Sequence, residues 1–189
     1  MTHAQPSLFE PDAGLPPGFV YRREFLSADE EAAIAAQLAA LPFAPFLFRG
    51  VEARRRVYSF GWRYDFTAGR VEEAEPIPPW LEAVRARAEA LAGLAEGALQ
   101  QLLINEYLPG APIGWHRDRA QFDRVVGVSL LAPCLFRLRK REGTRFARAG
   151  LTLAPRSAYV IAGEARQLWE HSIPPVSAHR YSLTFRSFR

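Results

Sequence analysis

The stretch that decides the fold is Val125-Val126-Gly127-Val128-Ser129-Leu130-Leu131, which is followed after a proline by Leu135-Phe136-Arg137-Leu138-Arg139. Both runs are short and rich in β-branched, aromatic and aliphatic residues, a composition typical of strands. Similar runs lie at 102–107, 151–153, 159–162 and 181–185, and glycine, proline or charged residues separate them. Short strands at this spacing predict a β-sandwich or barrel in the second half of the chain.

Two amphipathic helices are expected before these strands. Ser27 and Glu30 form a capping-box pattern at the start of a helix that Pro42 ends. A second helix is expected over 79–94, because prolines suit its first turn and apolar residues recur on one side. Helices that precede the strands, rather than alternate with them, argue against a parallel βαβ sheet. The predicted fold is α+β and mainly β, with a core buttressed on one side by N-terminal helices.

Composition is that of one globular domain. The chain has 189 residues, 49% hydrophobic and 23% charged, which excludes collagen-like and disordered classes. Proline and glycine at 1–18 predict a flexible N-terminal arm before a single domain at 19–189. The one cysteine, Cys134, excludes a disulfide framework and a four-cysteine zinc site. With neither a signal-peptide pattern nor a membrane-length apolar run, we expect a cytoplasmic monomer without a membrane partner.

Histidine is scarce, so its four positions are informative. His116 and Asp118 stand two residues apart, and on an extended backbone both side chains point to one side. Alone, this pair would equally suit a polar turn. His171, at the end of another apolar run, adds a second imidazole. Two imidazoles and one carboxylate form the ligand set of non-haem Fe(II) oxygenases, whereas structural zinc prefers a fourth ligand and cysteine. For His179 we expect a loop or surface position.

A pair of arginines marks the last predicted strand, Arg180-Tyr181-Ser182-Leu183-Thr184-Phe185-Arg186. Because Arg180 and Arg186 are an even number of residues apart, they share a face with Ser182, while the apolar residues share the other. Two inward arginines suit a small dicarboxylate, since guanidinium groups bind carboxylates in bidentate pairs. The alternative is that both arginines border the sheet and face water.

The ordered combination of these residues resembles the AlkB family of Fe(II)/2-oxoglutarate dioxygenases. It consists of His116-x-Asp118, then His171, then Arg180 and Arg186, and Asn105-Glu106-Tyr107-x-x-Gly110 before them is similar to the family's Asn-x-Tyr-x-x-Gly. The likeness covers about residues 54–188. It implies a double-stranded β-helix, or jelly-roll, fold, in agreement with the strand pattern.

The resemblance also implies cofactors and roles. His116, Asp118 and His171 would bind Fe(II) as the catalytic centre. Asn105, Tyr107, Arg180 and Arg186 would contact 2-oxoglutarate, and Ser182 stands where the DNA-repair members have an asparagine that contacts it. With O2, 2-oxoglutarate would be converted to succinate and CO2 while a C–H bond is hydroxylated, and hydroxylation of an N-methyl group would release formaldehyde.

Substrate recognition is less determined by the sequence. The repair members have an acidic residue two positions after the metal aspartate, where this chain has Ala120, although Asp123 or Glu164 would be nearby substitutes. Aromatic residues, Trp62 and Tyr64 among them, could stack on a flipped base or form ordinary rim packing.

A basic hairpin is predicted around Gly143. It carries Arg139, Lys140 and Arg141, which suit either a charged, solvated edge or a track for phosphates.

The sequence thus predicts an oxidoreductase that demethylates alkylated DNA or RNA, with a nucleic acid as its partner. Two alternatives stay open at this point. One is the same iron chemistry on a protein or small molecule, which Ala120 favours. The other is a nucleic-acid-binding module without catalysis, against which the intact set of metal ligands argues.

Overall fold

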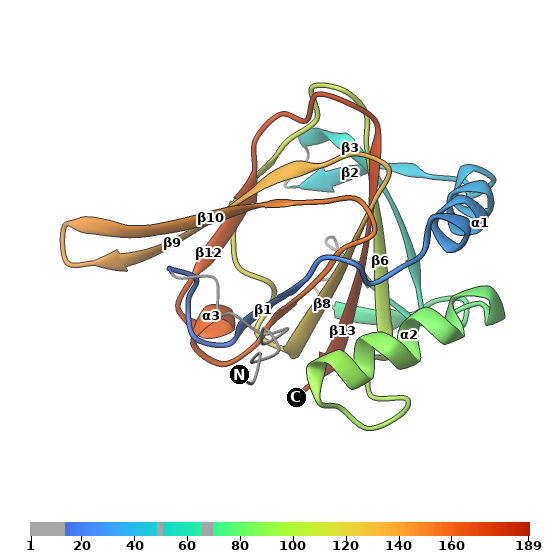
Figure 1. Cartoon of the computed structure of the whole chain (residues 1–189), viewed down its shortest axis with the longest axis horizontal. Coiled ribbons are helices and arrows are strands. Elements are labelled where there is room, and N and C mark those ends of the chain that lie inside the picture. Colours follow the sequence, from blue (N-terminus) through green and yellow to red (C-terminus); the bar gives the residue numbers. More distant parts are fainter. Residues whose placement is uncertain (1–13, 49–50, 66–69) are drawn as a thin grey trace, which may run out of the picture.

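The computed structural model describes residues 14–48, 51–65 and 70–189 and is built on two antiparallel sheets that face each other (Figure 1). The larger sheet has the strand order β1 (Phe19–Arg22), β11 (Ala158–Ile161), β8 (Phe122–Leu130), β13 (Arg180–Phe188), β6 (Gln101–Tyr107), β3 (Val51–Phe60) and β2 (Ala44–Phe48). The smaller sheet has the order β10 (Arg145–Leu153), β9 (Cys134–Glu142), β12 (Glu170–Ile173) and β7 (Ile113–His116). The predicted mainly-β jelly roll is confirmed.

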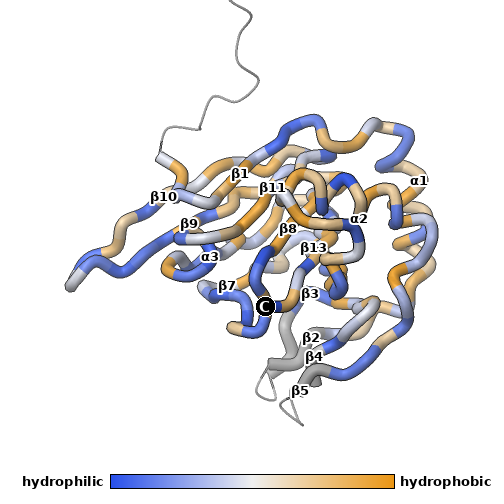
Figure 2. Tube along the Cα trace, turned by 90° about the horizontal axis from the view of Figure 1, so that it is seen from below, coloured by the Kyte–Doolittle hydropathy of each residue, from blue (hydrophilic) through white to orange (hydrophobic). Residues whose placement is uncertain are grey.

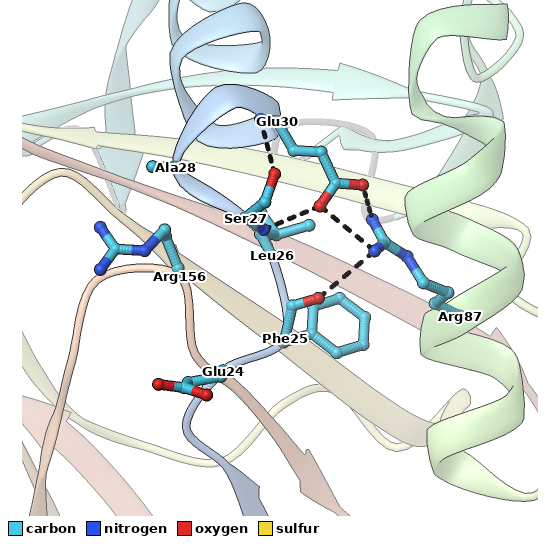
Figure 3. Close-up of a pocket in the computed structure, with 8 residues that line it drawn as sticks. All are labelled: Glu24, Phe25, Leu26, Ser27, Ala28, Glu30, Arg87 and Arg156. Carbon is cyan, nitrogen blue, oxygen red and sulfur yellow. Dashed lines mark hydrogen bonds and ion pairs between the residues drawn. The ribbon is translucent and has the colours of Figure 1, made fainter.

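Helices α1 (Ala28–Ala39) and α2 (Pro79–Ala92) cover the outer face of the larger sheet (Figure 1). The expected capping box starts α1: Glu30 N donates to Ser27 Oγ at 3.1 Å, and Ser27 N donates to Glu30 Oε2 at 2.8 Å. Arg87 of α2 reaches the same carboxylate, with Nη2 2.7 Å from Oε1 (Figure 3). A buried cluster that includes Leu38 and Leu81 joins both helices to the sheet. These contacts confirm the predicted helical buttress.

Strands β1, β2 and β3 were not expected from the sequence, because their arginines and prolines weaken the strand pattern. They extend the larger sheet on both edges. A separate pair, β4 (Trp62–Asp65) and β5 (Arg70–Glu73), follows β3, and the short helix α3 (Gly163–Gln167) precedes β12.

Alternation along the central strands divides the larger sheet into two faces. On β13, Tyr181, Leu183 and Phe185 belong to the cluster under the helices. Arg180 and Arg186 therefore point to the opposite side, the interior between the two sheets, and both are buried. The alternation of polar and apolar residues on this strand is as predicted.

The smaller sheet closes the interior from the other side. Phe136 and Leu138 of β9 pack with Phe19 and Tyr159 of the larger sheet in a second buried cluster. The long β9–β10 hairpin turns at Gly143, where φ is +60°, and extends beyond the body of the two sheets (Figures 1 and 2). The predicted basic hairpin is thus present.

Residues 1–13 of the predicted arm lie outside the described residues. At its end, Ala165 N donates to Pro17 O at 2.9 Å, and Leu15 packs against the second cluster. The boundaries at 1–18 and 19–189 remain predictions. Within the part of the chain that the structure describes, none of the helices has the length and apolar character needed to span a membrane.

Candidate metal centre and anion-binding residues

Two paired strands of the smaller sheet bring the metal-ligand candidates together. His171 of β12 is the register partner of His116 at the end of β7, and Asp118 follows two residues later. Their ligand atoms all lie within 4.8 Å of one another. His171 therefore lies beside His116 and Asp118 although more than fifty residues separate them along the chain, as a shared metal site requires.

Both imidazoles are arranged as neutral ligands. His116 Nδ1 lies 2.9 Å from Gly114 O, so this nitrogen donates to the carbonyl and leaves Nε2 for a metal. The pKa of His171 is lowered to about 3, chiefly by burial and next by the neighbouring His116, while Asp118 opposes the shift. Burial also lowers the pKa of His116. Neutral imidazole is the form that binds metal ions.

Asp118 is held as an anion. Burial is the largest single effect and raises the pKa of its carboxyl group. The neighbouring charges, first the Arg186 guanidinium and then His171, His116 and Arg166, together outweigh burial and hold the pKa well below its usual range. Arg186 Nε donates to Asp118 Oδ1 at 2.7 Å, and Arg186 Nη1 donates to Gln101 Oε1 at 2.8 Å. A carboxylate fixed in this way is a preorganised metal ligand.

Arg180 is a fully buried cation on the same strand. Its Nη2 donates to Ser129 Oγ at 2.9 Å, and its guanidinium lies 4.9 Å from the centre of the Tyr107 ring. Its Nε and Nη1 are buried without a hydrogen-bond partner among the described residues. A buried cation with unused donors suits an anionic ligand, because leaving it unpaired is costly.

The other predicted cosubstrate residues line the same interior. Ser182 lies between Asn105 of β6 and Ser129 of β8 in the register of the sheet, and Tyr107 lies opposite Arg180. Asn105, Ser182 and Tyr107 are all buried. Burial raises the pKa of Tyr107, while Arg180 opposes the shift, so its hydroxyl is retained as a donor.

The structure adds residues that the sequence did not single out. Arg55 of β3 is buried and donates from Nε to Asn105 Oδ1 at 3.2 Å. It stands in a run of three arginines, and only the pairing of β3 with β6 shows which of them faces the interior. Arg166 of α3 donates through Nη2 to Phe122 O at 2.9 Å and to Arg119 O, and so holds the turn that follows Asp118.

The residues present fit both groups that the resemblance implies. Two imidazole nitrogens and a carboxylate oxygen form one cluster, and they match the donor set of a non-haem iron site. The unused donors of Arg180 match a carboxylate at the far end of a small dicarboxylate. His179, in contrast, bonds to Glu106 at 3.2 Å, away from the cluster.

The predicted substrate residues are distributed differently. The Trp62 ring contacts Phe188, Phe188 contacts Phe122, and Arg186 lies over the Phe122 ring at 5.2 Å. This chain of contacts leads from Trp62 to the Arg186 side of the cluster. Tyr64 belongs to β4, but its side chain lies outside the described residues.

The hairpin residues divide between the two faces of the smaller sheet. Arg139 bonds to Glu170 at 2.6 Å on the outward face, which Arg141 shares because it stands two residues further along β9. Lys140 points to the other face and bonds to Glu164 at 3.0 Å. The three cations therefore do not form one continuous track.

Ala120 is exposed in the turn after Asp118. Of the two acids considered as substitutes, Glu164 is bonded to Lys140 and to Trp169 Nε1, and Asp123 lies 3.8 Å from Arg124. Both carboxylates are thus engaged by other groups.

Known proteins are similar to this chain in sequence and in fold. The model of the 2OG-Fe(II) oxygenase superfamily, whose members use Fe(II), 2-oxoglutarate and O2, matches residues 18–186. Mouse tRNA (carboxymethyluridine(34)-5-O)-methyltransferase ALKBH8 is 31% identical over 169 residues, which cover 85% of this chain and 25% of the mouse protein. The Salmonella typhimurium alpha-ketoglutarate-dependent dioxygenase AlkB is 30% identical over 150 residues, covering 68% of this chain and 67% of that protein.

The solved structure of OsALKBH1 has the same fold, with a TM-score of 0.71 at 19% identity over 92% of this chain and 98% of that one. The chain spans about a quarter of the length of the mouse relative. A family model that matches most of the chain, and a bacterial relative that aligns over two thirds of both proteins, lead to one assignment. The chain belongs to the 2OG-Fe(II) oxygenase superfamily and is an AlkB-like member of it.

Proposed function

We propose that this chain is an Fe(II)- and 2-oxoglutarate-dependent dioxygenase that demethylates alkylated DNA or RNA. The observation that carries the proposal is the cluster of His116, Asp118 and His171, with Arg186 bonded to the carboxylate. A nucleic-acid substrate is supported by the mouse relative, whose name refers to a tRNA.

His116, Asp118 and His171 would hold the iron, which when bound activates O2 and 2-oxoglutarate for hydroxylation of a C–H bond. Arg180 binds the distal carboxylate of 2-oxoglutarate through its unused donors. Arg186 keeps Asp118 ionised and oriented toward the cluster.

Buried polar and aromatic residues complete the proposed cosubstrate site. Asn105, Tyr107 and Ser182 present donors and acceptors along the cosubstrate. Phe136, whose ring is 5.3 Å from that of His171, excludes water from the same interior.

On the substrate side, Trp62 and Tyr64 are proposed to contact the target base near the Arg186 side of the cluster. Hydroxylation of an N-methyl carbon gives a carbinolamine, which loses formaldehyde and leaves the free base. The protein is further proposed to act as a monomer in the cytoplasm, for which size-exclusion chromatography and fractionation are the tests.

A panel assay tests this function. Purified protein with Fe(II), 2-oxoglutarate and air is incubated with methylated DNA, methylated RNA, a methylated peptide or no substrate, and succinate and formaldehyde are measured. We expect succinate production coupled to formaldehyde with an oligonucleotide, and none with Asp118→Ala. Production with the peptide alone would contradict the nucleic-acid substrate, and no production anywhere would contradict the enzyme.

A second candidate is the same iron chemistry on a protein or small molecule. The observation that favours it is Ala120, together with the engagement of Glu164 and Asp123 by other residues. Without a carboxylate there, a cationic methylated base lacks a partner charge.

A further inference from the structure

The outward face of the smaller sheet carries arginines and aromatic rings, on the side opposite to the metal ligands. His116 and His171 face the interior, so their neighbours Trp115 and Glu170 face outward from the same two strands. The hairpin continues this surface, because its register sets Arg141 beside Phe146 and Arg139 beside Arg148. We call this surface the basic face, and it consists of Trp115, Arg137, Arg139, Arg141, Phe146 and Arg148.

Aromatic rings order three of the four guanidinium groups of the basic face, those of Arg137, Arg139 and Arg141. Arg139 lies between two of them, 4.4 Å from the centre of Trp115 and 4.6 Å from that of Phe146. Arg137 lies over the Trp115 ring at 5.0 Å, and Arg141 over the Phe146 ring at 5.5 Å. Arginines held in this way lose little further freedom when they bind a ligand.

The basic face retains excess positive charge. Glu170 pairs with Arg139 at 2.6 Å and so offsets one of the four arginines. Arg141 and Arg148 are exposed. The inner face of the hairpin differs, because Lys140 there is paired with both Glu142 and Glu164. Charge on the hairpin is therefore asymmetric: the outward face keeps a net positive charge, whereas Lys140 and Arg145 on the inward face are balanced by Glu142 and Glu164.

The spacing of these arginines suits a polymer of phosphates. Arg137, Arg139 and Arg141 alternate on one strand, so successive members are about 6.8 Å apart. This is about twice the roughly 3.4 Å rise between phosphates along one strand of B-DNA. Planar guanidinium groups also bind phosphate oxygens in a bidentate manner.

We infer that the basic face binds the phosphate backbone of a nucleic acid at a second site, separated from the metal centre by the smaller sheet. The inference rests on the proposed function. One part of a long substrate lies on the basic face while its target nucleotide enters the interior. Because phosphate contacts read no base, this site supplies affinity and not sequence choice.

The hairpin offers a matched pair of variants for the test. Arg148 and Arg145 are both exposed on β10, but they stand three residues apart and point to opposite faces. Arg148→Gln and Arg145→Gln therefore remove the same charge from the outward and inward faces. Anisotropy of an unmodified, labelled 20-nucleotide strand is titrated with full-length protein at several salt concentrations.

For Arg148→Gln we expect weaker binding and a slope of log affinity against log salt that falls by about 0.7 relative to the native protein. For Arg145→Gln we expect no change. The double variant Arg141→Gln/Arg148→Gln should lose about twice as much slope. Equal effects of the two single variants, or a slope unchanged in the double variant, would overturn the inference.

Two further measurements separate the outcomes. Polyglutamate is added as a competitor, and if it displaces the oligonucleotide at an equal concentration of charge, the basic face is a site for acidic proteins and the inference is wrong. Turnover of a methylated trinucleotide is measured on the native protein and on the double variant. If the native protein does not turn over the trinucleotide, the proposed function is contradicted. The salt slopes, in contrast, test the basic face alone.

Discussion

Arg186 binds a single oxygen of Asp118: its Nε and Nη2 both lie 2.7 Å from Oδ1. The other oxygen, Oδ2, lies 3.6 Å from His171 Nε2. The two carboxylate oxygens thus have different neighbours, one a permanent cation and the other a metal-ligand candidate. Arg186 acts as a positioning residue for the cluster as well as a candidate for contact with 2-oxoglutarate.

Arg186→Gln should weaken metal binding, because Asp118 loses both its orientation and the cation that keeps it ionised. Partners of metal ligands are typically worth about 10- to 100-fold in affinity, and we expect a loss of that size for Mn(II). The Mn(II) affinity of native and variant protein is measured from the electron paramagnetic resonance signal of the free Mn(II) that remains in a titration. Arg23→Gln, an exposed arginine before α1, is the control, and an unchanged affinity in Arg186→Gln would contradict the positioning role.

His171→Ala should abolish turnover, whereas His179→Ala should leave it nearly intact. His171 belongs to the metal cluster, while His179 bonds to Glu106 at 3.2 Å outside it. The assay is succinate production with saturating Fe(II) and 2-oxoglutarate. The opposite result would mean that the wrong histidine has been assigned to the metal.

Arg180→Met should weaken 2-oxoglutarate binding without unfolding the protein. The buried guanidinium leaves Nε and Nη1 unpaired, so an apolar side chain of similar length relieves a desolvation cost. Loss of one partner of a buried charge pair costs about 2–5 kcal/mol, which raises the 2-oxoglutarate requirement by one or more orders of magnitude. Thermal unfolding with and without 2-oxoglutarate tests both parts. If 2-oxoglutarate raises the Tm of the variant as much as that of the native protein, Arg180 does not bind the cosubstrate.

Ala120→Asp should improve activity on cationic bases. The native protein is expected to act poorly on 1-methyladenine and 3-methylcytosine, because Ala120 offers no negative charge beside the metal centre. Demethylation of both bases in oligonucleotides is compared for native and variant protein, with a neutral methylated base as the control substrate. Efficient native repair of both bases would show that another acid fills this role.

Gly127→Ala should destabilise the fold, because a Cβ at this position on β8 would overlap the ring of Tyr159. Overpacking of this kind typically costs about 1–3 kcal/mol. Gly114→Ala is the matched control, since a Cβ there meets nothing within 4 Å. Urea denaturation compares the two variants, and equal stability would mean that the Tyr159 ring moves aside freely.

The sequence predicted the parts of the fold that depend on local pattern. The capping box of α1 and the alternation on β13 are read from neighbouring residues, and both are present. Strand β3 was missed because its three consecutive arginines obscure the alternation, which appears only when Val57 is paired with Asn105.

In the candidate site, too, the sequence predicted what depends on residue type and order but not what depends on contacts between distant segments. The types and order of His116, Asp118 and His171 were sufficient to expect a cluster, and the structure brings them together. Arg166 gave no signal, because its role depends on the carbonyl groups of a distant turn. The sequence analysis grouped Lys140 with Arg139 and Arg141, whereas in the structure Lys140 points to the other face of the sheet and pairs with Glu164, while Arg139 pairs with Glu170.

The alternation on β13 has a consequence for how this protein can change. Substitutions at Leu183 or Phe185 affect the helix side, and those at Ser182 or Thr184 affect the interior, so the two sides can vary independently. A single residue inserted into the strand cannot affect one side alone. It would turn every following side chain to the opposite side and carry Arg186 away from Asp118. Insertions and deletions that related proteins tolerate in β13 should therefore be confined to the ends of the strand. At one end, the register already shifts between Arg186 and Phe188.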